Sequence, residues 1–77
     1  MKEKNIELPK WFDGQVYPKG SIIQNRMGYG EIYCDANACS MYDLIIGAEV
    51  MGMYPLMQKG MSWFRKNYPE EYMVLLD

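Results

Sequence analysis

Two cysteines are the side chains best suited to chemistry in this sequence, and they frame the stretch CDANAC from Cys34 to Cys39. Thiolates are good zinc ligands, but a structural zinc site takes four ligands from Cys and His. The chain has two cysteines and no histidine, so only a homodimer that pools thiolates could complete such a site. A disulfide is sterically possible at this spacing.

Isolated cysteine pairs of reducing compartments usually behave as small buried hydrophobes. We therefore predict free thiols and no metal site. In this interpretation Cys34 ends a strand, residues 35–38 form a connection, and Cys39 with Ser40 leads into a helix cap.

The remaining motifs do not predict catalysis or a cofactor. The absence of histidine removes the commonest general base. The Gly-x-Gly of RMGYG lacks the third glycine and the following helix of a dinucleotide fingerprint, so Gly28 and Gly30 are interpreted as turn residues. We expect no catalytic residue and no cofactor. The carboxylates considered for a catalytic pair are interpreted as surface charges or caps: Asp13, Asp35, Asp43, Glu49, Glu70 and Glu71.

Charge and hydropathy argue against nucleic-acid and membrane partners. The net charge of -2 has the wrong sign for a phosphate-binding surface. The stretch WFRK, Trp63 to Lys66, could stack on a base, but we expect its aromatic rings in the core and its cations at a helix C-terminus. No apolar run reaches the roughly 18 residues of a membrane span, and the polar N-terminus has no signal region. These features predict a cytoplasmic protein.

The chain is short and unusually rich in Met and aromatic residues. Its 77 residues include eight Met, seven Tyr, two Trp and two Phe. A domain of this size buries only about 60% of its unfolded surface, and Met, Tyr and Trp are enriched at binding surfaces. We expect one domain over 8–77, preceded by a flexible terminus over 1–7, with apolar residues left over for an interface.

The N-terminal half predicts extended structure. Prolines and glycines interrupt LPKWFDGQVYPKG too often for a helix, so an aromatic extended segment is expected, with a short strand at 15–17. Two β-prone runs flank RMGYG and predict a hairpin with strands at 21–24 and 31–34.

The C-terminal half predicts helices. Ser40 with Asp43 forms a capping-box variant, and apolar residues at three- and four-residue steps predict a helix over 41–53. Further helices are expected over 55–67 and from Pro69 onward. The small residues Gly47, Ala48, Gly52 and Gly60 indicate either a close backbone approach between elements or a break near Gly52. The fold class is therefore α+β, with one antiparallel hairpin and an extended aromatic segment packed on two to three short helices.

The stretches LPKWFDGQVY, SMYDLIIGAE and WFRKNYPEEYMVLLD resemble a group of short uncharacterised proteins encoded by tailed phages of marine bacteria and by cyanobacterial phages. The resemblance spans residues 8–77. It implies the cytoplasm of an infected bacterium as the setting, and it implies no activity, cofactor or site residue.

We expect a non-enzymatic protein–protein interaction module, which in a phage would act on a host or phage protein. The alternatives are a minor virion or assembly component and, less favoured, a small enzyme or an enzyme accessory subunit. The partner is expected to be a protein of unknown identity or a second copy, in a homodimer formed through the C-terminal half. The candidate interface residues are Met51, Met53, Met57, Met61, Trp63, Tyr72, Leu75 and Leu76.

Overall fold

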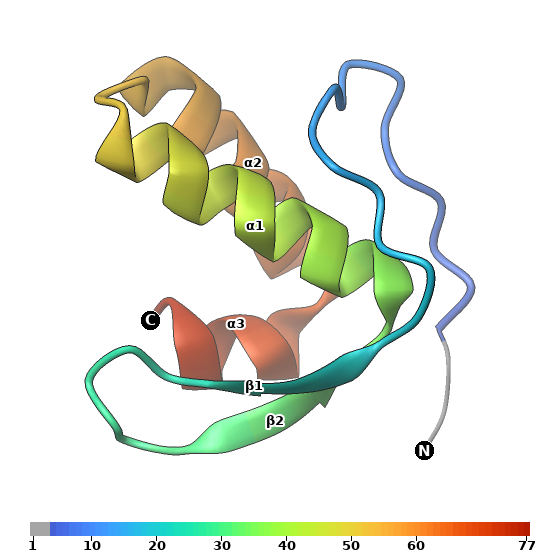
Figure 1. Ribbon diagram of the computed structural model, residues 1–77, viewed down its shortest axis with the longest axis vertical. Helices are drawn as coiled ribbons and strands as arrows, with labels where there is room; N and C mark the ends of the chain where they lie inside the picture. Colours follow the sequence, from blue (N-terminus) through green and yellow to red (C-terminus); the bar gives the residue numbers. More distant parts are fainter. Residues whose placement is uncertain (1–3) are drawn as a thin grey trace.

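The computed structural model describes residues 4–77, and its secondary structure consists of two strands followed by three helices (Figure 1). The elements are β1 (Ser21–Gln24), β2 (Glu31–Cys34), α1 (Ala36–Val50), α2 (Tyr54–Asn67) and α3 (Pro69–Leu75). This arrangement confirms the predicted α+β class. Helices α1 and α2 form a pair, and α3 lies between that pair and the hairpin (Figure 1).

Both strands of the hairpin begin and end at the predicted residues. β1 and β2 are antiparallel, with Ile23 opposite Ile32. The backbone N–H of Asn25 donates to the carbonyl of Gly30 at 2.7 Å, which closes the loop. Gly28 and Gly30 have φ angles of 80° and 149°, in the region that glycine enters without steric cost. The turn role predicted for these glycines is confirmed.

Helix α1 begins earlier than predicted. Its N-cap is Asp35, whose Oδ1 accepts a hydrogen bond from the backbone N–H of Ala38 at 3.0 Å. Ser40 lies inside the helix, where its hydroxyl donates to the carbonyl of Ala36 at 2.8 Å and accepts from the N–H of Tyr17 at 2.9 Å. The predicted cap at Ser40 and the predicted connection over 35–38 are therefore both wrong.

The α1–α2 pair explains two of the glycines. Gly60 on α2 is buried, and a Cβ at this position would lie 2.8 Å from Cγ1 of Ile45 on α1, so the helices approach closely here. Gly52 has a φ of 73° and lies in the turn where α1 ends. The sequence analysis gave a close backbone approach and a helix break as alternatives. Both occur: the close approach is at Gly60 and the break is at Gly52.

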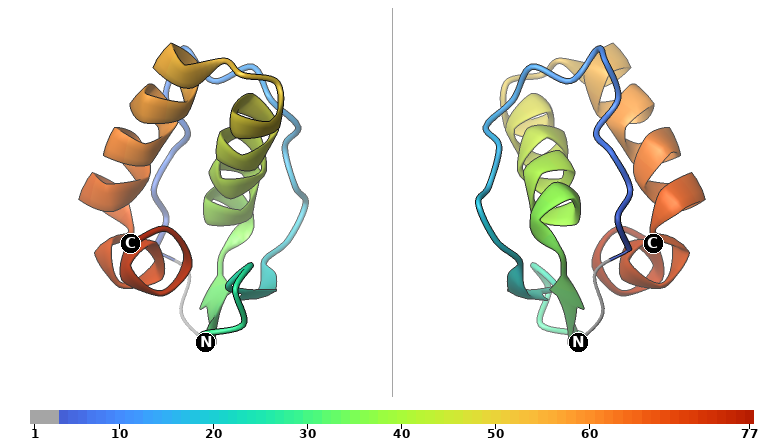
Figure 2. Two further views of the ribbon diagram at one scale, coloured as in Figure 1. Left: turned by 90° about the vertical axis from the view of Figure 1, so that its left-hand side faces the viewer. Right: turned by 90° about the vertical axis from the view of Figure 1, so that its right-hand side faces the viewer.

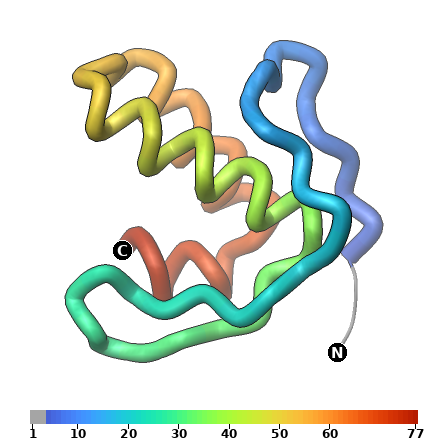
Figure 3. Tube along the Cα trace, viewed as in Figure 1, coloured from blue at the N-terminus to red at the C-terminus, as the bar shows by residue number. Residues whose placement is uncertain are grey.

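The N-terminal segment 4–20 runs along the helices, turns and returns to β1, as the trace in Figure 3 and the two views of Figure 2 show. Trp11, Phe12 and Tyr17 are partly buried against the core, and the ammonium of Lys59 lies 4.7 Å from the centre of the Trp11 ring. The segment is extended and aromatic, as predicted. The short strand expected at 15–17 does not form, and these residues are irregular.

The core lies where α1, α2, α3 and β2 meet. Its largest fully buried side chains are Tyr68, Phe64, Met41 and Ile45. Leu75 of α3 joins the same cluster at 4% exposure. The apolar C-terminal stretch is thus anchored in the domain by one of its own residues.

Candidate interaction surface

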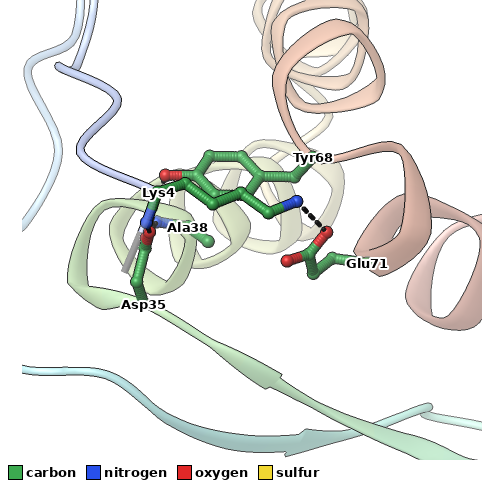
Figure 4. Close-up of polar contacts among 5 residues, drawn as sticks. All are labelled: Lys4, Asp35, Ala38, Tyr68 and Glu71. Atoms are coloured by element: carbon green, nitrogen blue, oxygen red, sulfur yellow. Dashed lines mark hydrogen bonds and ion pairs between the residues drawn. The ribbon is translucent and has the colours of Figure 1, made fainter. Parts of the chain in front are cut away.

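A buried polar cluster centred on Asp35 joins three distant parts of the chain (Figure 4). Besides capping α1, Oδ1 of Asp35 accepts from the Tyr68 hydroxyl at 2.9 Å, and Oδ2 accepts from the backbone N–H of Lys4 at 3.1 Å. Asp35 is 5% exposed and Tyr68 is fully buried. A buried carboxylate is costly unless it is hydrogen-bonded, and these three donors supply the required bonds.

Lys4 extends the cluster to α3. Its ammonium lies 3.1 Å from Oε1 of Glu71, which is itself buried, and 5.1 Å from the centre of the Tyr68 ring (Figure 4). The carbonyl of Ile6 also accepts from the Asn37 amide at 2.7 Å. In the predicted flexible terminus, residues 1–3 lie outside the described residues, while Lys4 and Ile6 are held by these contacts.

This cluster resembles an acid–base constellation only in its residue types. Throughout 4–77, every buried side-chain nitrogen and oxygen has a hydrogen-bond partner. The hydrogen bonds and the ion pair of this cluster join the N-terminal segment, the β2–α1 junction and α3. They involve Asp35, Tyr68 and Glu71. None of them lines either of the two cavities described below. We therefore assign the cluster a structural role.

The cysteines lie beside this cluster and are both free and buried, which confirms the predicted free thiols. Cys34 ends β2 as predicted, whereas Cys39 lies within α1 rather than before a cap, and its thiol points to the carbonyl of Cys34 at 3.5 Å. Burial, followed by the nearby Cys39, raises the pKa of the Cys34 thiol to about 12. A thiol held protonated is a poor nucleophile and a poor metal ligand. Within the described part of the chain, no group of three or more His, Cys, Asp or Glu side chains is placed to hold a metal ion.

A cavity of about 430 Å³, here called the hollow, lies between the hairpin loop, α1, α2 and the end of α3. Its apolar lining includes Ile45, Met57, Met61 and Leu76. Arg26, Glu49 and Asp77 supply its charged groups, and the guanidinium of Arg26 lies 2.7 Å from Oε1 of Glu49. The hollow thus combines an apolar lining with charges of both signs.

The hollow gathers part of the predicted interface. Met57, Met61 and Leu76 line it and are partly buried, so they retain accessible surface. Leu75 also contributes to its wall, but at 4% exposure Leu75 is a core residue.

The other predicted interface residues lie elsewhere. Met51 and Met53 are exposed at the turn between α1 and α2. Trp63 is partly buried, with its ring centre 5.7 Å from that of Tyr68. Tyr72 lines a second cavity of about 380 Å³, together with Arg65 and Met73. Whether any of these residues binds a partner stays a prediction.

Sequence reasoning missed the hairpin tip. Met27 and Tyr29 are 74% and 83% exposed, and both line the edge of the hollow. The sequence does contain a pattern that predicts this exposure. Tyr29 lies between two glycines in a hairpin loop, and glycine has no side chain that could cover the tyrosine ring.

The tip is braced from two sides. The Asn25 amide donates to the carbonyl of Val74 at 2.7 Å, and its Oδ1 accepts from the N–H of Met27 at 2.7 Å. The Arg26–Glu49 ion pair holds the other side of the loop against α1. The loop therefore presents Met27 and Tyr29 from a fixed backbone.

The chain matches no known protein-family model, no characterised protein and no solved structure. Among residues 4–77, no helix has both the length and the apolar character needed to cross a membrane.

Proposed function

We propose that this chain is a non-enzymatic protein-binding module whose binding surface is the hollow together with the hairpin tip. The observation that carries the proposal is the position of Met27 and Tyr29, exposed on a braced loop that lines a cavity with both apolar and charged residues. Exposed apolar groups rimmed by polar residues are typical of protein interaction sites. Tyrosine is a frequent anchor at such sites.

The chemistry of the surface favours a protein partner. Met57 and Met61 bring flexible thioethers that adapt to another protein's side chains, and the aromatic tip supplies a rigid contact. The charges at the hollow are of both signs, which does not favour a phosphate backbone. Asp35, Tyr68 and Glu71 are engaged in the buried cluster, and the Glu49 carboxylate at the hollow is paired with Arg26. These contacts support a non-enzymatic role.

The resemblance to phage proteins supports the bacterial cytoplasm as the setting of this proposal, with a host or phage protein as the target. Affinity capture from a bacterial lysate, followed by mass spectrometry, tests it with three baits: the natural chain, Met57→Lys at the hollow, and Val16→Lys. Val16 is 63% exposed and does not line the hollow. The N-terminal segment to which it belongs lies on the side of the molecule opposite the hairpin loop (Figure 1). Circular dichroism establishes that all three baits are folded.

We expect the natural chain and Val16→Lys to retain the same protein and Met57→Lys to lose it. The captured protein can also be a second copy of the chain, detected by chemical cross-linking. If the natural chain and Val16→Lys cross-link to it and Met57→Lys does not, this result also supports protein binding at this surface. If no bait retains any protein, or if all three retain the same proteins equally, the proposal is wrong.

A further inference from the structure

Met27 and Tyr29 of the hairpin tip line the hollow and remain largely exposed, so one face of the molecule carries both a cavity and accessible apolar side chains. A two-fold symmetric dimer brings the same surface patch of both copies together, and it requires a patch that complements itself. We propose that the partner recognised by this surface is a second copy of the chain, with the tip of each copy inserted in the hollow of the other. This inference rests on the proposed function and names its partner.

The sizes of the two parts match. A cavity of about 150 Å³ is enough to hold a benzene ring, and the hollow measures about 430 Å³. It therefore has room for the ring of Tyr29 and, beside it, the thioether of Met27. The lining that these groups would meet, Met57 and Met61, is itself apolar and adaptable.

The tip is prepared for insertion. Ordering a flexible loop on binding costs free energy, and a preorganised loop avoids much of that cost. The hydrogen bonds of Asn25 to the carbonyl of Val74 and to the N–H of Met27 already hold the loop in the single chain. Met27 and Tyr29, by contrast, keep 74% and 83% of their surface exposed, so their burial remains available to drive association.

The charges around the hollow are also self-complementary. Arg26 is the cation, and Glu49 and Asp77 are the carboxylates. A patch of a single charge sign would repel its own copy. Here Arg26 lies 2.7 Å from Glu49 of its own chain, and the remaining N–H donors of its guanidinium are available to the Asp77 carboxylate of the other copy. A foreign partner would require no such balance within the patch.

The surface area that each copy would have to bury in a stable dimer is a small part of its total surface. A standard interface takes about 800 Å² from each partner, which is about 15% of the 5237 Å² surface of this chain. A small domain also gains from such pairing because oligomerisation adds to a limited core.

Light scattering after gel filtration, over a concentration series, measures the mass directly. We expect the natural chain to shift from 9.0 kDa toward twice that mass as the concentration rises. Tyr29→Lys should raise the dissociation constant at least tenfold, while Val16→Lys should dissociate like the natural chain. Both positions are exposed, so neither substitution should disturb the fold.

A charge-swap mixture tests the reciprocal geometry. Tyr29→Asp alone and Met57→Lys alone should each associate poorly. Mixed, they form a dimer with one unaltered contact and one contact that pairs Asp with Lys, so the mixture should associate at least tenfold more tightly than either variant alone.

A natural chain that remains monomeric at every concentration would overturn this inference. So would a dimer that Tyr29→Lys and Val16→Lys weaken equally, or a mixture no tighter than its components. If the chain is monomeric yet the capture experiment retains a foreign protein through Met57, the proposed function stands without its self-partner. If neither experiment detects an association, both are wrong.

Discussion

At the scale of single residues, Asp35 makes the most consequential contacts, because one carboxylate caps α1 and also holds Tyr68 and Lys4. Asp35→Ala should lower the free energy of unfolding by about 2–4 kcal/mol, from the lost cap and the lost buried acceptor. Asp35→Asn should cost less, since its amide oxygen can still accept at the cap. Urea denaturation measures both changes, with exposed Asp13→Ala as the control.

Ser40 provides the matching comparison, because the sequence predicts the cap there and the structure does not. Ser40→Ala removes the acceptor of the Tyr17 N–H, and the loss of one such bond should cost about 1 kcal/mol, or roughly 4–8 °C in melting temperature. Asp35→Ala should therefore destabilise the protein more than Ser40→Ala. The reverse order would mean that the helix starts at Ser40 after all.

Cys34 should be chemically silent in the folded protein. With its pKa raised to about 12 from an ordinary 9.0, it should resist thiol reagents at pH 8, whereas denaturation without reductant should expose two reactive thiols. At pH values between these two pKa values, the Cys34 thiol is ionised in the unfolded chain and protonated in the folded protein. The free energy of unfolding should therefore fall as pH rises from about 9 to 12. Rapid labelling of Cys34 in the native state would contradict its burial.

At the scale of elements, two helical glycines should respond to the same substitution with opposite signs. Nothing lies within 4 Å of a Cβ placed on Gly47, so Gly47→Ala should stabilise α1 by about 0.5–1 kcal/mol. A Cβ on Gly60 meets Ile45 at 2.8 Å, and the resulting overpacking, typically about 1–3 kcal/mol, should outweigh the helix gain. Thermal unfolding of the two variants and the natural chain gives both signs. Stabilisation by Gly60→Ala would mean that α1 and α2 pack less closely than described.

The elements differ in how well the sequence predicts them, and each difference has a physical cause. The hairpin was predicted at both boundaries because Gly28 and Gly30 mark its loop unambiguously. The start of α1 was missed because its early residues Ala38, Cys39, Ser40 and Met41 are consecutively buried. With several sides of the helix covered, no three- or four-residue period marks the first turn, and the capping box was predicted at Ser40 instead.

At the scale of the whole molecule, the candidate surface was predicted only in part. Met57 and Met61 are four residues apart on α2 and were expected to share one face, and both line the hollow. Leu75 was expected at the surface, but the hairpin and helices bury it, and a local sequence pattern does not say which distant element covers a side chain. Leu75→Asp would therefore test the stability of the core rather than an interface.

The two ion pairs found among residues 4–77 differ in burial, and burial should decide their strength. Arg26 and Glu49 are 2.7 Å apart with side chains 54% and 40% exposed, whereas Lys4 and Glu71 are 3.1 Å apart at 33% and 9% exposed. Distance alone would favour the first pair. Solvent screening limits exposed pairs to about 0.2–1 kcal/mol, while hydrogen bonds to charged groups under partial burial contribute about 1.5–3 kcal/mol.

We therefore expect Lys4 and Glu71 to be the more strongly coupled pair, at about 1–2 kcal/mol once the remaining exposure of Lys4 is allowed for. A double-mutant cycle with Lys4→Met and Glu71→Gln measures this coupling, and Arg26→Met with Glu49→Gln is its matched control. Urea denaturation at low salt and at about 1 M salt adds a second criterion, since salt should weaken the exposed pair more. Equal couplings, or a larger one for Arg26 and Glu49, would show that the contact between the N-terminal segment and α3 is not what holds that segment to the domain.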